Sequence, residues 1–334
     1  STNRYELADF SEYNDIFLLH NSSGKLNGVK ESIFMENIKD YSGRWRWNMV
    51  NDFRPQSIES SGIKCYPTAN YVNYYGMQNG YPINDMTKAD AESGYDPTHP
   101  WKNRDPRFYK TIMFDGVKWK STGGAGGTAE LFTGGRESEE ANEKKGCFTA
   151  YMNSKLCPQL MNTVDGYKEN NIMILSLMRL ADVYLMYAEA TAVGYNGPKG
   201  KAATYSLTAE EALNKIRERA GVAPVLDKFL GSTADFLSEL RRERAVELSF
   251  EGFRFIDLRR WMLLTQYPYT LKTKIEFDRA DPNDYNYDEP EENAIKNLRE
   301  VVLLERKYTD RHYWYPLPKK DVSMYEGFYQ NPGW

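Results

Sequence analysis

The sequence contains few of the residues that form covalent cross-links or bind metals. Its 334 residues include three cysteines, Cys65, Cys147 and Cys157, and three histidines. An odd number of cysteines leaves at least one thiol unpaired and cannot form a full disulfide framework. No Cys-x-x-Cys pair or Cys–His spacing indicates a zinc site. We therefore expect neither a bound metal nor a cofactor.

Long apolar runs and an excess of positive charge are also missing. No apolar segment approaches the roughly 20 residues that a membrane-spanning helix needs, and no secretory signal begins at Ser1. The 43 Lys and Arg residues nearly balance the 47 Asp and Glu residues. No basic stripe accompanies the aromatic residues, so nucleic acid is not an expected partner. The length allows one large domain or two small ones.

Motifs of the common enzyme classes are not found either. The histidines form no His-Glu-x-x-His pattern, and the glycine-rich stretch lacks the strand–loop–helix context of a phosphate-binding loop. The acidic pairs Glu139-Glu140 and Glu291-Glu292 lie in polar stretches, which disfavours the enclosed acid and base of a glycoside hydrolase. We therefore expect that the protein is not an enzyme.

The sequence is rich in aromatic side chains, with 25 Tyr, 15 Phe and 7 Trp. Tyr and Trp combine a flat apolar face with a polar tip, which suits polar ligands and wet interfaces. The segment YSGRWRWNMVNDF joins such rings to Arg and Asn side chains that can hydrogen-bond sugar hydroxyls. The alternation of its two tryptophans also fits a strand that buries both rings in a core. The candidate ligand-binding residues are Tyr41, Arg44, Trp45, Arg46, Trp47 and Asn48.

A second unusual segment, residues 232–264, mixes charged and aromatic side chains. Glu239, Glu243 and Glu247 recur every four residues and therefore line one face of a helix, with arginines interleaved among them. One interpretation is a surface helix with many salt bridges. The other, favoured by the interleaved rings, is a structural network in which arginines form bidentate pairs with buried carboxylates. Neither interpretation makes the segment catalytic.

The second half of the chain has the pattern of packed helices. From about residue 171, apolar residues recur with helical spacing. Thr208 and Glu211 form a capping box for a helix that Gly221 ends, and Ser232 begins the next helix in a similar way. A long helix, a loop and a shorter helix resemble a tetratricopeptide-like hairpin, which needs neighbours to bury its apolar face.

The patterns of the remaining segments predict turns, loops and extended chain. Asp115-Gly116, between FYKTIMF and VKWKS, predicts a short β-hairpin. Residues 121–146 are rich in glycine and predict a surface loop. Residues 278–293 predict an exposed acidic excursion, whose aspartates are spaced like calcium ligands but more simply form a solvated loop. The tail from Tyr313 contains three prolines and should be extended.

Several segments together carry a family resemblance. ELRRERAVELSFEGFRFIDLRRW looks like a family signature, and LMRLADVYLMYAEA and ALNKIRERAGV resemble the helices that precede it. PTANYVNYYGMQNGYPI and NRDPRFYKTIMFDGVKW are similar to the opening of the family's C-terminal region. YPLPKKDVSMYEGFYQNPGW is similar to its end. In this order, the segments resemble the SusD/RagB family, the surface glycan-binding lipoproteins of Bacteroidetes.

The resemblance implies a mainly α fold, in which tetratricopeptide-like helical hairpins adjoin a loop-rich region with short β-hairpins. Residues 1–334 would form one C-terminal region of this kind. Within it, residues 1–66 resemble the segment upstream of the family's C-terminal domain, and residues 67–334 resemble that domain, with the helical hairpin at about 171–264. Family members begin with a lipoprotein signal and a helical N-terminal half, so we expect this chain to be part of a longer precursor.

The resemblance also implies a function. Family members bind oligosaccharides or polysaccharides without cleaving them, at the extracellular face of the outer membrane, and deliver them to a SusC-like TonB-dependent transporter. Contact with the membrane would be made only through an N-terminal lipid anchor. The alternative is a scaffold that docks the transporter or a peptide and has no sugar site of its own. Joint exposure of Trp45 and Trp47 would favour glycan binding, and burial of both would favour the scaffold.

Overall fold

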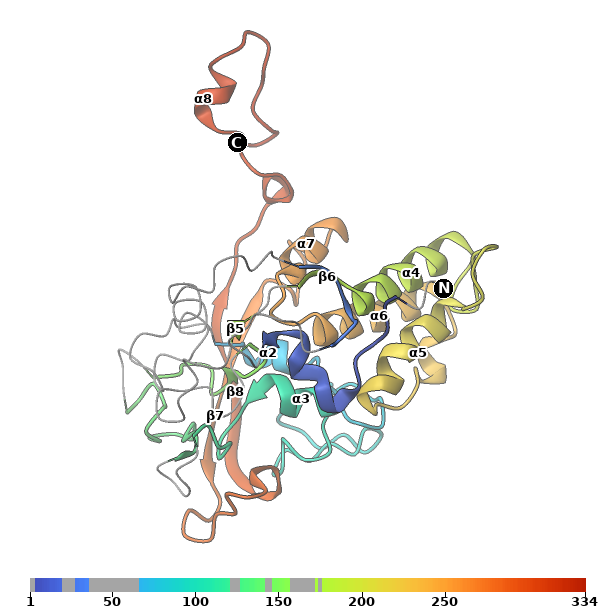
Figure 1. Ribbon diagram of the computed structural model, residues 1–334. Coiled ribbons are helices and arrows are strands. Elements are labelled where there is room, and N and C mark those ends of the chain that lie inside the picture. Colours follow the sequence, from blue (N-terminus) through green and yellow to red (C-terminus); the bar gives the residue numbers. More distant parts are fainter. Residues whose placement is uncertain are drawn as a thin grey trace.

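The computed structural model describes residues 4–19, 28–35, 66–120, 127–141, 146–156, 172–173 and 176–334. Three helices, α4, α5 and α6, pack together on one side of the molecule, and the long hairpin of β7 and β8 runs along the other (Figure 1). The chain leaves the end of this hairpin as an arm that projects from the body, and we call residues 306–334 the C-terminal arm.

The helices of the second half are α4 (Leu180–Gly194), α5 (Ala209–Ala220), α6 (Thr233–Glu247) and α7 (Phe253–Arg260). Small residues bring α4 and α5 close together, and these two helices share one hydrophobic core with α6. Its fully buried members include Ala181, Leu185, Ala188, Ala212, Leu213, Ile216, Phe236 and Leu240.

The predicted helix signals are confirmed at their termini. The Thr208 hydroxyl accepts a hydrogen bond from the Glu211 backbone N–H at 3.2 Å, and the Glu211 carboxylate accepts one from the Thr208 N–H at 2.7 Å. The Ser232 hydroxyl caps α6 by accepting from the Asp235 N–H at 3.1 Å. Gly221 ends α5 in the left-handed conformation, with φ of 72°. These local devices fix where the helices begin and end.

The predicted start of the first helix, at about residue 171, is too early. Residues Ser176–Arg179 form the strand β6, which pairs with β2 (Ser32–Met35), and α4 begins only at Leu180. The apolar residues that suggested one long helix continue into this strand, but there Leu177 and Met178 are exposed and the buried side chains are those of Ser176 and Arg179. A strand pairing with a segment more than 140 residues away leaves no local signal.

All described strands pair as antiparallel two-stranded units. The short pairs are β1 (Leu18–Leu19) with β5 (Ile172–Met173), β2 with β6, and β3 (Ile112–Met113) with β4 (Met152–Asn153). The long pair is β7 (Leu271–Arg279) with β8 (Ile295–Glu305), in which Lys274 lies opposite Val301. The connection between these two strands includes the short helix η5 (Pro290–Glu292).

The hairpin predicted around Asp115-Gly116 is wrong, although the turn itself is present. Gly116 has φ of 83°, but the residues before it form the helix α3 (Pro106–Thr111), and β3 pairs with β4 instead of with the residues after the turn. Asp105 begins α3 by accepting a hydrogen bond from the Arg107 N–H at 2.9 Å, with proline at the first helical position. This start signal outweighs the strand propensity of the residues that follow.

Two predicted loops contain more buried residues than expected. Within the glycine-rich segment, residues 127–141 are described, and Ala129 and Leu131 are buried in the main core. In the acidic excursion, Tyr285 is buried and donates a hydrogen bond to the Asp115 carboxylate at 3.0 Å. Each loop is therefore anchored by an apolar or aromatic residue and is not wholly a surface feature.

The main core lies between the β7–β8 hairpin and the helices α2 (Ala69–Val72) and α3. Trp101 is completely buried there, and its ring stacks on Phe114 with centroids 5.0 Å apart. At the N-terminal end of the chain, η1 (Phe10–Ile16) packs Tyr13 and Phe17 into a smaller cluster. No helix in the described part of the chain is long and apolar enough to cross a membrane.

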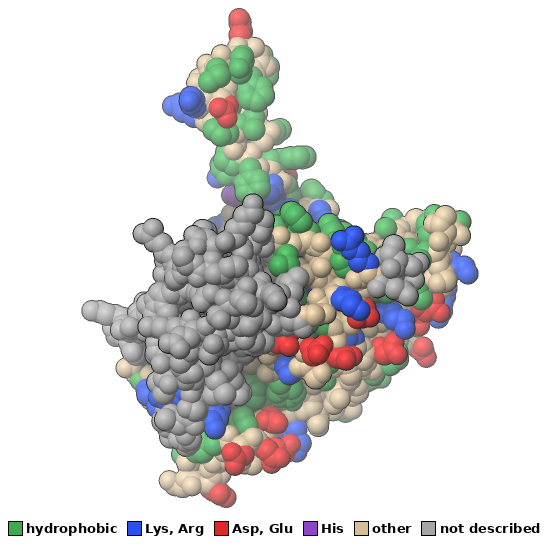
Figure 2. Space-filling model, viewed as in Figure 1, with side chains coloured by type: hydrophobic (Ala, Val, Ile, Leu, Met, Phe, Trp, Pro, Cys, Tyr) green, Lys and Arg blue, Asp and Glu red, His purple; other side chains and the backbone are tan. Residues whose placement is uncertain are grey.

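The C-terminal arm is largely extended, as its prolines predict, with two short helical turns, η6 (Asp310–Tyr313) and α8 (Lys319–Val322). Its base is held by Arg259 of α7, whose Nε donates to the Tyr313 carbonyl at 3.0 Å. Apolar and aromatic side chains gather on its surface (Figure 2). The exposed ones are Trp314, Tyr315, Met324, Tyr325, Phe328, Tyr329 and Trp334.

Candidate ligand-binding site

The acidic face of α6 is buried and paired with arginines. Glu239, Glu243 and Glu247 have no more than 2% of their surface exposed. Arg217 of α5 donates to Glu243 at 2.9 Å and also contacts Glu239, while Arg107 of α3 donates to Glu247 at 3.0 Å and contacts Glu243. The arginine-rich segment is therefore a buried structural network, the second of the two interpretations of the sequence.

Arg179, at the end of β6, extends the network toward the N-terminal segment. Its guanidinium donates to the carboxylates of Glu31 at 2.6 Å, Glu247 at 2.7 Å and Glu251 at 2.7 Å. Lys155 donates to Glu251 at 2.6 Å as well. The network thus joins α6 to strands that lie far from it in the sequence.

The electrostatics of this network exclude acid–base chemistry by its carboxylates. Burial alone would raise the pKa of Glu247, but Arg219, Arg179 and Arg107 hold that pKa well below its ordinary value. Burial also opposes ionisation of Glu251, and Arg179 with Lys155 outweighs it, so this pKa is lowered too. Carboxylates held ionised in this way cannot donate a proton near neutral pH.

The residues predicted to bind ligand lie outside the part of the chain that the structure describes. They are Tyr41, Arg44, Trp45, Arg46, Trp47 and Asn48. Among the aromatic residues that the structure describes, Tyr75 and Trp101 are fully buried in the core. Tyr71 differs, because it lines an open groove.

This groove, with a volume of about 450 Å³, lies where α2, the start of α7 and the ends of β7 and β8 adjoin. Its size falls within the range of about 300–1,000 Å³ that is usual for small-molecule sites. Aromatic rings and long cationic side chains line it, and none of its lining residues in the described part of the chain is Asp or Glu. The lining residues are Tyr66, Pro67, Thr68, Tyr71, Phe250, Gly252, Arg254, Phe255, Lys272 and Arg306.

The aromatic wall of the groove is fixed by contacts beneath it. The Tyr71 hydroxyl donates to the Ala245 carbonyl of α6 at 2.6 Å, and its ring lies 6.1 Å from that of Phe250. Phe250 has a left-handed backbone, with φ of 62°, in the corner between α6 and α7. A side chain in this conformation costs about 1–2 kcal/mol, which the surrounding packing must offset. Phe255 presents an exposed ring at the rim.

The cationic wall comes from three separate segments. Arg254, in the first turn of α7, donates from Nη2 to the Tyr74 hydroxyl at 2.8 Å, and its guanidinium lies 4.8 Å from the Tyr74 ring centroid. Lys272 projects from β7, and burial, together with the charges of Arg306 and Arg254, lowers its pKa to about 8. Arg306 follows β8 and donates to the Tyr308 hydroxyl at 2.9 Å.

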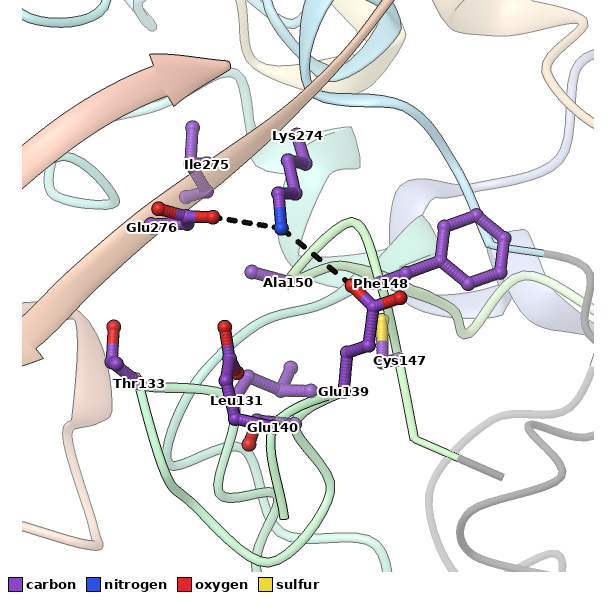
Figure 3. Close-up of a pocket in the computed structure, with 11 residues that line it drawn as sticks. Leu131, Thr133, Glu139, Glu140, Cys147, Phe148, Ala150, Lys274, Ile275 and Glu276 are labelled. Carbon is purple, nitrogen blue, oxygen red and sulfur yellow. Dashed lines mark ion pairs between the residues drawn. The ribbon is translucent and has the colours of Figure 1, made fainter. Parts of the chain in front are cut away.

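A second cavity, beside β7, is too small for a ligand of this size. Its volume is about 10 Å³, which is the space of roughly one water molecule. Lys274 points across it and pairs with Glu276 at 2.7 Å and Glu139 at 3.6 Å (Figure 3). Cys147 also lines it, and burial raises the pKa of its thiol to about 11, which keeps the thiol protonated at neutral pH.

No group of three or more potential metal ligands occurs among the described residues. The aspartates of the acidic excursion are instead occupied by local contacts. Asp281 accepts hydrogen bonds from the backbone N–H groups of Asn283 at 3.0 Å and Asp284 at 3.3 Å, and Asp278 accepts one from the Asn297 side chain at 2.7 Å. Such Asx turns are typical of a solvated loop.

The groove was not predicted from the sequence. Its cations come from α7, β7 and the residue after β8, so they are separated by 18 and 34 residues in the chain. The pairing of β7 with β8 brings Lys272 near Arg306, and the contact of Arg254 with Tyr74, beside the helix α2 that packs on β7, brings Arg254 to the same place. A search for clustered motifs cannot detect such a site.

Comparison with known proteins identifies the family. A model of the SusD family matches residues 30–334, so the chain belongs to the SusD family. A search of the curated proteins found no match.

Solved structures share the fold. A SusD-like protein from Bacteroides fragilis NCTC 9343 superposes with a TM-score of 0.69 at 23% identity, over 99% of this chain and 59% of that one. A SusD-like carbohydrate binding protein from the same organism gives 0.62 at 20% identity, over 95% and 57%. Surface glycan-binding protein A from Bacteroides fluxus gives 0.50 at 19% identity, over 100% and 56%. The chain thus spans less than two thirds of these proteins, and the likeness is one of fold.

Proposed function

We propose that this chain captures an oligosaccharide or polysaccharide at the cell surface without cleaving it. Its membership of the SusD family over residues 30–334 carries the proposal. Structures of the same fold include a SusD-like carbohydrate binding protein and a surface glycan-binding protein. The open groove with aromatic and hydrogen-bonding side chains adds a surface of suitable size and chemistry for a sugar.

The proposed mechanism is binding by many weak contacts. Aromatic rings stack on the apolar C–H faces of the sugar, and Arg, Lys and Asn side chains donate or accept hydrogen bonds at its hydroxyls. Tyr41, Arg44, Trp45, Arg46, Trp47 and Asn48 remain the proposed primary contacts. The proposed partner is a SusC-like TonB-dependent transporter, and the proposed location is the extracellular face of the outer membrane, where a lipid anchor would hold the protein.

A second candidate function is a scaffold that docks the transporter or a peptide and has no sugar site. The C-terminal arm favours it, because Tyr329 is 82% exposed and Tyr325 66% exposed, and exposed aromatic residues mark interaction surfaces. The packed helices α4 and α5 would form the tetratricopeptide-like hairpin of such a scaffold. Their outer surface exposes Met186 and Val193, which a further helix could cover.

The test is affinity gel electrophoresis across plant, host and microbial polysaccharides. We expect one glycan to retard the protein and the Trp45→Ala/Trp47→Ala variant to migrate without retardation. The matched control is Trp314→Ala, which removes an exposed indole from the arm and should leave retardation unchanged. Assays of reducing ends should detect no cleavage of the glycan that binds. If no glycan retards the wild-type protein, the scaffold becomes the better proposal.

A further inference from the structure

The groove between α2, α7 and the β7–β8 hairpin carries a concentration of positive charge. Arg254, Lys272 and Arg306 all line it, and no Asp or Glu is among its described lining residues. Within the described residues, no ion pair joins any of the three to an acidic side chain. Cations that share a partly buried site repel one another and lose hydration, so this arrangement costs free energy unless an anion enters.

Of the three cations, Arg254 has the clearest unused hydrogen-bond donor. Its Nη1 atom is buried and has no hydrogen-bond acceptor among the described residues. Arg217 also has one such nitrogen, but its other nitrogens donate to the carboxylates of Glu239 and Glu243. Within the described residues, the Arg254 guanidinium donates to the Tyr74 hydroxyl and lies over the faces of two tyrosine rings, and no carboxylate pairs with it. A buried guanidinium N–H of this kind can donate a hydrogen bond to an oxygen atom of a ligand.

The start of α7 adds a second favourable element. Gly252 and Arg254 both line the groove, and Gly252 is the residue that caps α7. As a glycine it has no side chain to cap the helix. The first backbone N–H groups of a helix attract anions through their partial positive charge.

The aromatic residues distinguish an acidic sugar from a free inorganic anion. Tyr66, Tyr71, Phe250 and Phe255 line the same groove as the cations. An inorganic anion would gain nothing from these rings, whereas a sugar places its C–H face on a ring and its charged group on a guanidinium. The combination of rings with cations therefore matches a saccharide that carries a carboxylate or a sulfate.

We propose that this groove is a subsite for an acidic saccharide, in which Arg254 and Lys272 bind the carboxylate or sulfate and the aromatic wall stacks on the sugar ring. Arg306, at the exposed rim, attracts the charged ligand. The proposal rests on the proposed function and narrows it to acidic glycans. The same cations could bind the carboxylate of a uronic acid or the sulfate of a sulfated sugar, and the test distinguishes these two classes of ligand.

The test uses isothermal titration calorimetry with oligosaccharides of polygalacturonic acid, which carries carboxylates only, of carrageenan, which carries sulfates and no carboxylate, and of the neutral glucan laminarin. We expect one of the acidic series to bind and the neutral series to bind at least about ten-fold more weakly, as the loss of a charge-assisted pair implies. Arg254→Gln and Lys272→Gln should each weaken acidic binding by about ten-fold or more. Two independent variants keep the test valid if one of them fails to fold.

The matched control is Lys274→Gln on the same strand. Lys274 already pairs with Glu276 and Glu139 and lines the small cavity, so its loss should leave acidic binding unchanged. Equal binding of acidic and neutral oligosaccharides, or an unchanged affinity in Arg254→Gln and Lys272→Gln, would overturn the proposal while leaving glycan capture in place.

A second readout tests the anion site without a glycan. Acylation of Lys272 by an amine-reactive reagent is followed by peptide mass spectrometry, with and without inorganic sulfate. Protection of Lys272 but not of the exposed Lys88 supports the anion site. If sulfate protects Lys272 while no acidic saccharide binds, the groove is an anion site and the acidic-saccharide assignment fails, whereas glycan capture is decided separately by the electrophoresis. If sulfate gives no protection and acidic sugars do not bind, the anion site itself is overturned.

Discussion

Arg179 and Glu247 are joined by two hydrogen bonds of 2.7 Å, one to the Glu247 carboxylate and one to its backbone carbonyl. Both side chains are completely buried. Through this pair the last turn of α6 is fixed to the end of β6, and therefore to the strand β2 that pairs with it. A pair of this kind specifies how distant segments meet, because few other arrangements satisfy all of its donors and acceptors.

Removing the charge of Glu247 should strongly destabilise the protein. Glu247→Gln leaves Arg107, Arg179 and Arg219 with less negative charge in a buried site. Breaking a buried pair on one side costs about 3–5 kcal/mol, and we expect a loss of that size in the free energy of unfolding, measured by urea titration. The control is Glu218→Gln, which breaks the exposed pair with Lys215 and should cost less than about 1 kcal/mol. Equal losses in the two variants would contradict the structural role of the network.

The same carboxylates predict how stability depends on pH. The pKa values of Glu239, Glu243, Glu247 and Glu251 are lowered in the folded state, because nearby arginines outweigh the effect of burial. A lowered folded pKa stabilises the protein above the unfolded value of about 4.3 and loses that contribution as pH falls. Urea titrations should therefore show steady stability from pH 5 to 7 and a steep decline below about pH 4.5.

Glu247→Gln should reduce the steepness of that acid decline, because the variant has one fewer carboxylate to protonate on unfolding. Glu218→Gln, at an exposed site, should keep the wild-type slope. An acid decline of the same steepness in all three proteins would show that other groups control acid unfolding.

The features that could be predicted from the sequence are those whose cause is local. The capping box of Thr208 and the glycine stop at residue 221 depend on neighbours within four residues, and both are confirmed. The burial of the α6 glutamates followed from the aromatic residues interleaved with them. Local rules of this kind also gave the turn at Gly116.

The features that could not be predicted depend on distant partners. Asp115 was read as part of a hairpin turn, yet its carboxylate accepts hydrogen bonds from the Leu131 N–H at 2.7 Å and from Arg279 at 2.7 Å. These contacts, together with α3, replace the expected hairpin. The groove likewise needs Arg254, Lys272 and Arg306 from three elements, so no stretch of sequence contains its pattern.

The end of α5 provides a test of backbone conformation. Gly221 has φ of 72°, and an added Cβ would meet only the Pro106 side chain at 4.0 Å. Gly221→Ala should therefore cost about 1–2 kcal/mol through backbone strain alone. Gly231→Ala is the matched control, since its added Cβ meets nothing within 4 Å and its φ is not in the left-handed region. Thermal unfolding should show a lower Tm for the first variant and an equal or slightly higher Tm for the second. A Tm unchanged by Gly221→Ala would argue against the left-handed cap.

Binding of an acidic saccharide in the groove should weaken above pH 8. Burial and the neighbouring Arg306 and Arg254 lower the pKa of Lys272 to about 8, so raising the pH from 7 to 9 removes most of its charge. Both arginines remain charged over this range. If binding requires the ammonium form, calorimetry should show affinity for the acidic oligosaccharide falling by about ten-fold between these pH values.

The Lys272→Arg variant keeps the positive charge at this position but does not lose it between pH 7 and pH 9. The guanidinium stays protonated well above pH 9, so this variant should bind the acidic oligosaccharide with nearly the same affinity at pH 7 and pH 9. Lys272→Gln should also lose the pH dependence, but with weak binding at both values. If the Lys272→Arg variant loses affinity between pH 7 and pH 9 as steeply as the wild-type protein, another group titrates, and Lys272 does not bind the charged group of the ligand.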